Sequence, residues 1–344
     1  RLSAMNDKAA PEADVVLETC VSLLRNFADV PFDASMSDEE AMHNVARVNA
    51  ALEEAGQRDA FVMSRLTDMT ASERGRLAEH GLIDRDLLKN AARTAAFLSK
   101  GATINIGVNG TEHVRIDAAL QGFQLERTAG LAFMADDWLD GAGAYAYDEQ
   151  FGYLTAEPIL AGAGMIASVT LHLPALRASG QTTRLMRDMD KKGLSLKKRF
   201  EEKGDQSGLY RLSAAVKMGQ TEEEALEALS DAALALIAAE RAVRERILEQ
   251  DKLLMEDRAG RSLALIGAAR LMSATEMRER CSDVRLAAAL GLIDWPLDAI
   301  DRLLGEMSDA SIECRVAEKL TERQRDMLRA DALREAIGRL EGTA

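Results

Sequence analysis

The stretch from Asp148 to Leu176, DEQFGYLTAEPILAGAGMIASVTLHLPAL, decides the fold expected for this chain. It predicts a strand, a loop of small residues with two glycines, and a second strand. Pro174 ends the second strand because proline cannot donate to a β-ladder. Apolar residues at alternate positions of that strand predict a single buried face: Ala167, Val169, Leu171 and Leu173. The glycine loop is compatible with an anion cradle and with a tight bend, and its spacing favours the bend.

The composition narrows the class of protein. The chain has 344 residues with 57 acidic and 43 basic side chains, a net charge of -14. Such a surface repels nucleic acid and anionic lipid, so we expect neither nucleic acid nor a membrane as a partner. The cysteines are too few and too scattered for a disulfide framework or a zinc site: Cys20, Cys281 and Cys314. His43 and His172 have no second ligand at metal spacing, so no metal site is expected.

The same observations favour a cytoplasmic location. No apolar run approaches the ~18 residues of a membrane span, and no signal-peptide pattern is recognised. Few cysteines fit a reducing compartment.

Local patterns predict the elements. Residues 1–13 are polar and alanine-rich, which predicts a flexible segment. Capping signals at Ser37, Thr70 and Thr221 each have a glutamate three residues later and predict helix starts. Strands are expected at 104–108, 114–116 and 209–216; helices at 125–141 and from Leu176 to about 192; a surface loop at 194–208; and a long helix from 221 to about 248. Beyond residue 256 the periodicity is helical throughout, and the shift in composition predicts two domains, 14–250 and 251–344.

Seven segments, in order along almost the whole chain, resemble the ATP:guanido phosphotransferases and, within that family, the bacterial protein-arginine kinases. They are DVVL…LLRN at 14–26, VNGTEHVRI at 108–116, YAYDEQFGYLTAEP at 145–158, GAGMIASVTLHLPAL at 162–176, MEDR at 255–258, SDVRLAAALGLI at 282–293 and RDMLRA at 325–330. The resemblance implies an α+β fold, with an antiparallel sheet flanked by helices and a C-terminal helical domain used for dimerisation.

The resemblance also implies a site in which arginines neutralise a triphosphate and a carboxylate deprotonates the guanidinium. Six of the implied positions have lost that chemistry. The family has arginines, two glutamates and a reactive cysteine where this chain has Cys20, Ser22, Ile166, Gly110, Thr111 and Glu157. We therefore expect no intact catalytic residue.

Other positions keep part of the family pattern. The nucleotide-binding remnants implied by the resemblance are Arg25, His113, Arg115, Lys197 and Glu202. A structural ion pair explains Arg25 equally well. Lys197 lacks the planar fork with which arginine grips two phosphate oxygens.

One functional motif is intact. In the protein-arginine kinases the RDxxRA motif binds phosphoarginine, and here it reads Arg325-Asp326-Met327-Leu328-Arg329-Ala330. Arg325 and Arg329 are four residues apart, so both project from one helix face, and Asp326 can accept from a guanidinium. An ordinary solvated helix face remains an open alternative.

Two hypotheses follow. In the first, the chain is a catalytically degenerate pseudokinase that needs no cofactor and acts as a homodimeric regulatory or phosphoarginine-sensing protein. Its partners would be phosphoarginine-bearing proteins or an active kinase paralogue. In the second, it is an active enzyme that uses ATP and Mg2+ to phosphorylate protein arginine, or has altered chemistry using Glu112, Glu157 and Glu202.

Overall fold

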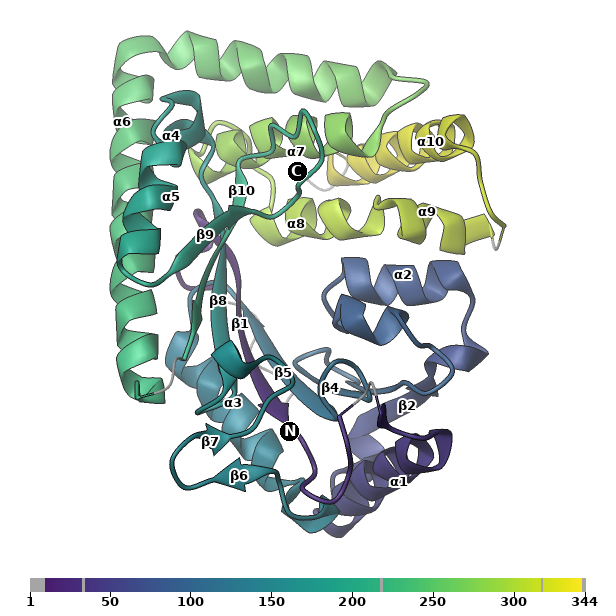
Figure 1. Cartoon of the computed structure of the whole chain (residues 1–344). Coiled ribbons are helices and arrows are strands. Elements are labelled where there is room, and N and C mark those ends of the chain that lie inside the picture. The colour runs from purple at the N-terminus through teal and green to yellow at the C-terminus, as the bar shows by residue number, and fades with distance from the viewer. Residues whose placement is uncertain (1–9, 33–34, 217–218, 317, 342–344) are drawn as a thin grey trace.

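A computed structural model describes residues 10–32, 35–216, 219–316 and 318–341. Its centre is an eight-stranded antiparallel sheet in the order β2-β3-β4-β5-β1-β8-β10-β9 (Figure 1). The strands are β1 (Val16–Arg25), β2 (Phe61–Arg65), β3 (Ala95–Ser99), β4 (Ile104–Val108), β5 (Val114–Gln121), β8 (Met165–His172), β9 (Ser195–Lys198) and β10 (Leu209–Ala215). A small hairpin, β6 (Tyr147–Asp148) and β7 (Gly152–Tyr153), precedes β8.

Helices pack against the sheet and form a second, C-terminal layer (Figure 1). Those of the first part are α1 (Asp38–Glu54), α2 (Ala71–Glu79), α3 (Leu125–Asp137), α4 (Pro174–Ala178), α5 (Thr182–Lys191) and α6 (Glu222–Ala268). Those of the second part are α7 (Ala274–Ala289), α8 (Leu297–Glu306), α9 (Asp309–Val316) and α10 (Glu322–Glu341). The expected α+β fold is confirmed.

Three helices begin where the capping signals predict. Ser37, Thr70 and Thr221 each accept a hydrogen bond from the third backbone amide of the helix, and the glutamate there reaches back to the cap. These capping boxes start α1, α2 and α6, and each cap stabilises its helix by about 1 kcal/mol.

The prediction of a single buried face on β8 is wrong. One face packs into the main hydrophobic core with α1, α3 and the first half of α6. On the other face Thr170 is 2% exposed and His172 is fully buried. The His172 ring contacts Ser282 on α7, because the C-terminal helices cover this end of the strand. The polar residues of β8, Thr170 and His172, therefore lie on a second buried face of the strand.

Two other expectations need correction. Within the predicted surface loop 194–208, residues 195–198 form β9 and pair with β10. The helix expected from Leu176 to about 192 is divided into α4 and α5 around Gly180, whose φ of 74° interrupts the helix.

Most of the segment predicted to be flexible, residues 1–9, lies outside the described residues. The remainder is held in place: Pro11 accepts from the amide of Phe123, and Ala13 accepts from the guanidinium of Arg285. Residues 10–13 therefore have defined contacts with the rest of the chain.

Helix α6 connects the two parts of the molecule and bends sharply at Asp251, where φ is -157° and ψ is 75°. Its first half packs on the sheet, and its second half crosses above the C-terminal helices (Figure 1). The second half of α6 and the C-terminal helices share a separate core, built on Ile266, Met277, Val284, Ile300 and Leu333 among others. The predicted boundary near residue 250 falls at this bend and stays a prediction.

Two of the contacts between the C-terminal helices and the sheet domain join residues more than 200 positions apart in the sequence. Arg285 on α7 is fully buried and donates to the backbone oxygens of Ala13 and Asp14. At the second contact, α9 lies along α2, where Ser72 donates to Glu313 at 2.9 Å (Figure 1). None of the described helices is long and apolar enough to cross a membrane.

Candidate functional site

Neighbouring strands bring the expected phosphate-binding positions together on one face of the sheet. Ser22 on β1 pairs with Asp117 on β5 and with Ile166 on β8. Cys20 and Arg115 lie two residues from Ser22 and Asp117, so they point to the same face. The expected positions therefore lie together on one face of the sheet, although three of their side chains carry no charge.

Arg115 is the one arginine kept at these positions, and carboxylates surround it. Its guanidinium lies 2.9 Å from Asp84 and 3.0 Å from Asp117, and it donates to Ser22 at 3.0 Å. Ser22 also donates to Asp117 at 2.5 Å. Burial opposes the charged form, yet Asp117 and Asp84 raise the pKa of Arg115 above its usual range. The charge of Arg115 is thus neutralised within the protein.

A cavity of about 190 Å³ opens beside this arginine. Its lining contains four carboxylates and one guanidinium: Asp84, Asp86, Glu112, Glu157 and Arg115. A site for a triphosphate needs the opposite balance of charge.

The positions expected to carry the catalytic base hold no free carboxylate. Gly110 has no side chain, and the hydroxyl of Thr111 donates to Asp86 at 2.6 Å. Glu112 is 6% exposed and accepts from Asn26 at 2.5 Å and from the backbone amide of Ala156 at 3.0 Å. Glu112 therefore fixes the loop before β8.

His113 has structural contacts. The ring accepts from the amide of Phe27 at 3.0 Å, and its other nitrogen lies 3.0 Å from the carbonyl oxygen of Pro31. With one nitrogen accepting, the other carries the proton and donates to Pro31.

Arg25 forms a buried ion pair, as the structural alternative predicted. It is 2% exposed and donates to Asp136 at 2.7 Å and to the carbonyl oxygen of Ala163 at 3.1 Å. Its guanidinium also lies 3.8 Å from the ring centre of Tyr153, a cation–π contact. Arg25 therefore joins β1 to α3 and to the glycine loop.

Glu157 and Cys20, two positions that differ from the family pattern, have different surroundings. Glu157, in place of the family cysteine, is exposed and lines the acidic cavity. Burial, together with the charges of Asp117 and Glu18, raises the pKa of Cys20 to about 12. The Cys20 thiol is therefore protonated near neutral pH and a weak nucleophile.

Lys197 and Glu202 are not brought together with Arg115 in the acidic cavity. Lys197 is exposed on β9, opposite Arg211 on β10. Glu202 forms an ion pair with Arg278 on α7. Neither lines the acidic cavity.

Sequence reasoning missed Arg199, which donates to Glu18 at 3.0 Å and to Thr170 at 3.2 Å on the same sheet face. The signal was available, because Arg199 is two residues after Lys197 and a strand repeats its direction every two residues. Asp84 and Asp86 were also missed. They lie in a 3₁₀ turn, Arg85–Leu88 and its cap, far from β5 in sequence.

The RDMLRA motif lies on α10, but its second arginine is fully buried. Arg329 donates to the carbonyl oxygens of Met307 and Met272 at 2.7 and 2.9 Å, and it pairs with Asp326 and Asp309. Arg325 is partly exposed and pairs with Glu313 at 3.0 Å. The motif therefore holds α10 against α9 and the start of α7.

No group of three or more His, Cys, Asp or Glu side chains among the described residues is arranged to hold a metal ion.

Comparisons with known proteins show the family and the fold of the chain. Residues 43–243 match the ATP:guanido phosphotransferase C-terminal catalytic domain, and residues 252–344 match the protein-arginine kinase McsB C-terminal domain. A protein-arginine kinase of Caldanaerobacter subterraneus subsp. tengcongensis is 32% identical, covering 96% of this chain and 99% of the relative. The protein-arginine kinase of Halalkalibacterium halodurans is also 32% identical, covering 97% and 94%.

Solved structures share the fold. Lombricine kinase aligns with a TM-score of 0.58 at 19% identity, covering 69% of this chain and 73% of that one. The duplicated taurocyamine kinase of Schistosoma mansoni aligns with a TM-score of 0.61 at 20% identity and covers 72% of this chain but 36% of the longer one.

The sheet and its helices thus define a guanidino-kinase fold. The chain belongs to the ATP:guanido phosphotransferase family, and its relatives and C-terminal region assign it to the bacterial protein-arginine kinase branch.

Proposed function

We propose that this chain is a catalytically degenerate protein-arginine kinase, a pseudokinase that works as a homodimeric regulatory or phosphoarginine-sensing protein. The observation that carries the proposal is the state of Arg115. The only arginine kept among the expected phosphate ligands is paired with Asp84 and Asp117.

The family cofactor does not fit the residues present. ATP with Mg2+ would bring its phosphates to a cavity where Asp84, Asp86 and Glu157 face them and one neutralised guanidinium remains. Each lost charge-assisted contact weakens binding by about 1.5–3 kcal/mol. Loss of the base at Gly110 and Thr111 lowers a phosphotransfer rate by a further ~10²–10⁴. The residues of this cavity are therefore not suited to phosphoryl transfer from ATP.

Calorimetric titration of ATP, with and without Mg2+, tests the proposal. The expected result is no saturable heat at millimolar nucleotide and no phosphoarginine in mass spectra of an arginine-rich substrate protein. Tight ATP binding together with phosphoryl transfer to free or protein arginine would contradict the pseudokinase proposal.

One observation favours the active-kinase alternative: relatives 32% identical over nearly their whole length are named protein-arginine kinases. The variant with altered chemistry has less support. Glu202 pairs with Arg278 outside the cavity, and Glu112 is held by Asn26, which leaves Glu157 as the only open carboxylate of the three. The calorimetric titration separates the two hypotheses.

The sensing part of the proposal depends on the RDMLRA motif. A phosphoryl group would replace Glu313 and Asp309 as the partners of Arg325, since Arg325 is the more exposed arginine of the motif, its side chain being 23% exposed. Arg329 would not contact the ligand, because it already donates to the carbonyl oxygens of Met307 and Met272; its role would be to hold α10 in position.

Titration of phosphoarginine against the protein tests this directly. We expect saturable binding that Arg325→Gln weakens about tenfold or more, the equivalent of one charge-assisted hydrogen bond. Arg323→Gln, at a neighbouring exposed position of α10, is the matched control and retains binding. Equal binding in both variants, or none in the parent protein, would remove the sensor.

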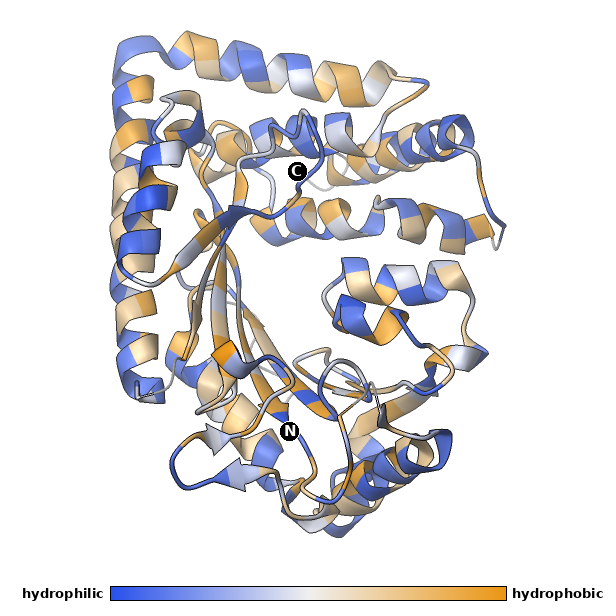
Figure 2. Ribbon diagram, viewed as in Figure 1, coloured by the Kyte–Doolittle hydropathy of each residue, from blue (hydrophilic) through white to orange (hydrophobic). Residues whose placement is uncertain are grey.

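Exposed leucines on the second half of α6 support the homodimer. Leu253, Leu254 and Leu265 are 72%, 53% and 46% exposed, and apolar patches along this arm are visible in Figure 2. Leu254 and Leu265 are eleven residues apart, so they lie on one side of the helix. A second copy of this chain is the proposed occupant of that side.

A further inference from the structure

Helices α2 and α9 form a seam between the sheet domain and the C-terminal helices. Three hydrogen bonds cross it: Ser72 to Glu313 at 2.9 Å, the amide of Ala310 to Glu79 at 3.1 Å, and His80 to Ser311 at 2.9 Å. Beside these hydrogen bonds, the side chains of the two helices leave a space between them.

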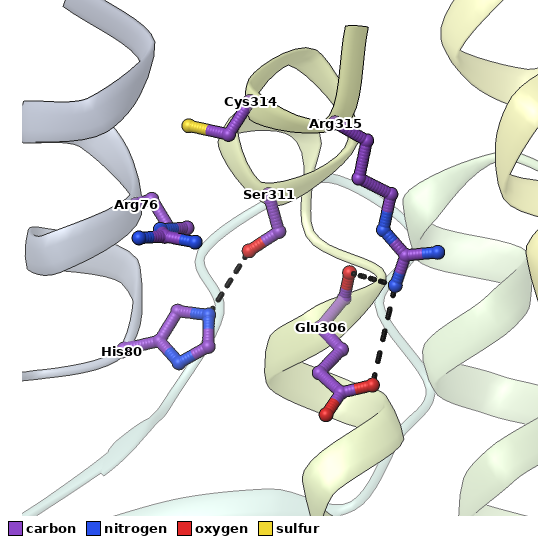
Figure 3. Close-up of a pocket in the computed structure, with 6 residues that line it drawn as sticks. All are labelled: Arg76, His80, Glu306, Ser311, Cys314 and Arg315. Atoms are coloured by element: carbon purple, nitrogen blue, oxygen red, sulfur yellow. Dashed lines mark hydrogen bonds and ion pairs between the residues drawn. The ribbon is translucent and has the colours of Figure 1, made fainter.

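A cavity of about 330 Å³ remains in the seam. Figure 3 shows its lining, with the Arg76 and His80 side chains coming from the sheet domain and the others from α8 and α9. The lining residues are Arg76, His80, Glu306, Ser311, Cys314 and Arg315. None of them belongs to the acidic cavity or to the RDMLRA motif.

The lining of the cavity contains two arginines and one glutamate. Arg76 makes no hydrogen bond or ion pair through its guanidinium with any residue in the described part of the chain. Arg315 reaches the backbone oxygen of Glu306 at 3.4 Å and its carboxylate only at 4.0 Å. Within the lining, two guanidinium groups accompany one carboxylate, that of Glu306, and outside the lining the carboxylate of Glu73 lies near Arg76.

The hydroxyl of Ser311 fixes the proton of the neighbouring histidine. Ser311 donates to the carbonyl oxygen of Gly305 at 3.0 Å, which uses its only hydrogen. The contact with His80 must therefore be donated by Nε2 of the imidazole. Nδ1 is then without a proton when His80 is neutral, and on protonation it becomes a further donor.

We propose that this cavity binds a small phosphoryl dianion, held from α2 by Arg76 and from α9 by Arg315, and that the ligand strengthens the contact between the two domains. Planar guanidinium forks match two oxygens of a phosphoryl group each. The volume lies at the lower end of small-ligand sites, about 300–1,000 Å³, and suits a phosphoryl group with a short substituent. Inorganic phosphate and a phosphorylated amino acid share this chemistry.

His80 provides a reporter for the site. Burial and the charge of Arg76 lower the pKa of His80 below 6.5, while Glu79 and Glu306 oppose this shift. Arg315 is the remaining charged group of the lining. A bound dianion compensates Arg76 and therefore raises the pKa of His80.

The experiment is an NMR pH titration of the imidazole signals in sodium phosphate and in sodium chloride at equal ionic strength. The chain has four histidines, so the signals can be assigned by substitution. We expect phosphate, and not chloride, to raise the pKa of His80. We also expect slower hydrogen exchange of the α2 amides in phosphate. A parallel titration with phosphoserine tells whether a substituted phosphoryl group binds more tightly than the free ion.

Arg76→Gln is the test variant, and it should fold because no hydrogen bond or ion pair among the described residues uses the Arg76 guanidinium. It should weaken phosphate binding about tenfold or more. Arg184→Gln removes the same charge from an arginine on α5 whose side chain is 84% exposed, and it should leave the phosphate response unchanged. The proposal fails if phosphate and chloride act alike on His80, or if both variants respond as the parent protein does.

Discussion

At the scale of single residues, side chains expected to serve nucleotide binding have structural partners. Arg25 binds Asp136, and Glu112 binds Asn26 and a loop amide. Arg115 forms ion pairs with two carboxylates, those of Asp84 and Asp117. A residue at a family position is therefore not evidence of the family activity, because its contacts decide what it can still bind.

Asp84 is predicted to block nucleotide from Arg115. In Asp84→Asn the side-chain oxygen can still cap the following 3₁₀ turn, as Asp84 does at 2.8 Å, while one negative charge leaves the cavity. We expect ATP binding to strengthen by about 1 kcal/mol, or roughly fivefold, because one like charge near the phosphates is removed. Saturation-transfer NMR, which detects binding too weak for calorimetry, measures the affinity against Asp188→Asn, a partly exposed control on α5. Equal affinities in the two variants would contradict the role given to Asp84.

Arg329 is predicted to be a major stabilising residue of the C-terminal helices. Arg329→Ala would leave Asp326 and the carbonyl oxygens of Met307 and Met272 without their buried donor. We expect a loss of about 3–5 kcal/mol in the free energy of unfolding, the usual cost of breaking a buried ion pair. Urea denaturation measures it, with Arg325→Ala as the more exposed comparison, expected to lose less. Near-parental stability of Arg329→Ala would show that the motif is not structural.

At the scale of elements, what the sequence could predict depended on how local the determinant is. Capping boxes at Ser37, Thr70 and Thr221 act within one turn and were found. Strand β9 was missed because its pairing with β10 is a contact across a loop. The second buried face of β8 was missed because α7, which covers it, is more than a hundred residues further along the chain. The acidic cavity was missed for the same reason, since Asp84 meets Arg115 only in three dimensions.

The contact between β8 and α7 predicts a pH dependence of stability. Burial, followed by the charges of Arg285 and Arg244, lowers the pKa of His172 well below 6.5. The unfolded chain then binds a proton near pH 6.5 that the folded chain excludes, so stability falls as the pH drops below that value. The slope is at most about 1.4 kcal/mol per pH unit for one proton.

Chemical denaturation at pH 7.5, 6.5 and 5.5 measures this loss. His172→Gln should flatten the dependence, and His80→Gln, at a more exposed histidine with a smaller downward shift, should flatten it less. Identical slopes in the parent protein and His172→Gln would show that other groups cause the effect. The carboxylates with lowered pKa values, such as Asp14, act only nearer pH 4.

At the scale of the whole molecule, we propose that α6 determines how the protein assembles. Its first half is part of the main core, and its second half extends beyond Asp251 with leucines facing solvent. An exposed apolar strip of this kind marks a contact surface.

The homodimer prediction is tested by substituting both leucines. Leu254→Glu with Leu265→Glu should convert the dimer to a monomer in light scattering after size-exclusion chromatography, because two charges cannot be buried in the contact. Leu234→Glu, at a 45% exposed leucine in the first half of α6, is the matched control and should leave the dimer intact. A parent protein that is monomeric at micromolar concentration would end this proposal.

The network around Ser22 limits which side chains can be introduced at the phosphate-binding positions that the family pattern implies. Its hydroxyl lies between Asp117 and the guanidinium of Arg115, at 2.5 and 3.0 Å. An arginine introduced at position 22 alone would crowd a second cation against Arg115 and compete for Asp117. An arginine at Ile166 would enter the same crowded space, since the two positions are cross-strand partners. We therefore expect that arginines at positions 22 and 166 can be accommodated only together with further changes around Asp117 and Arg115.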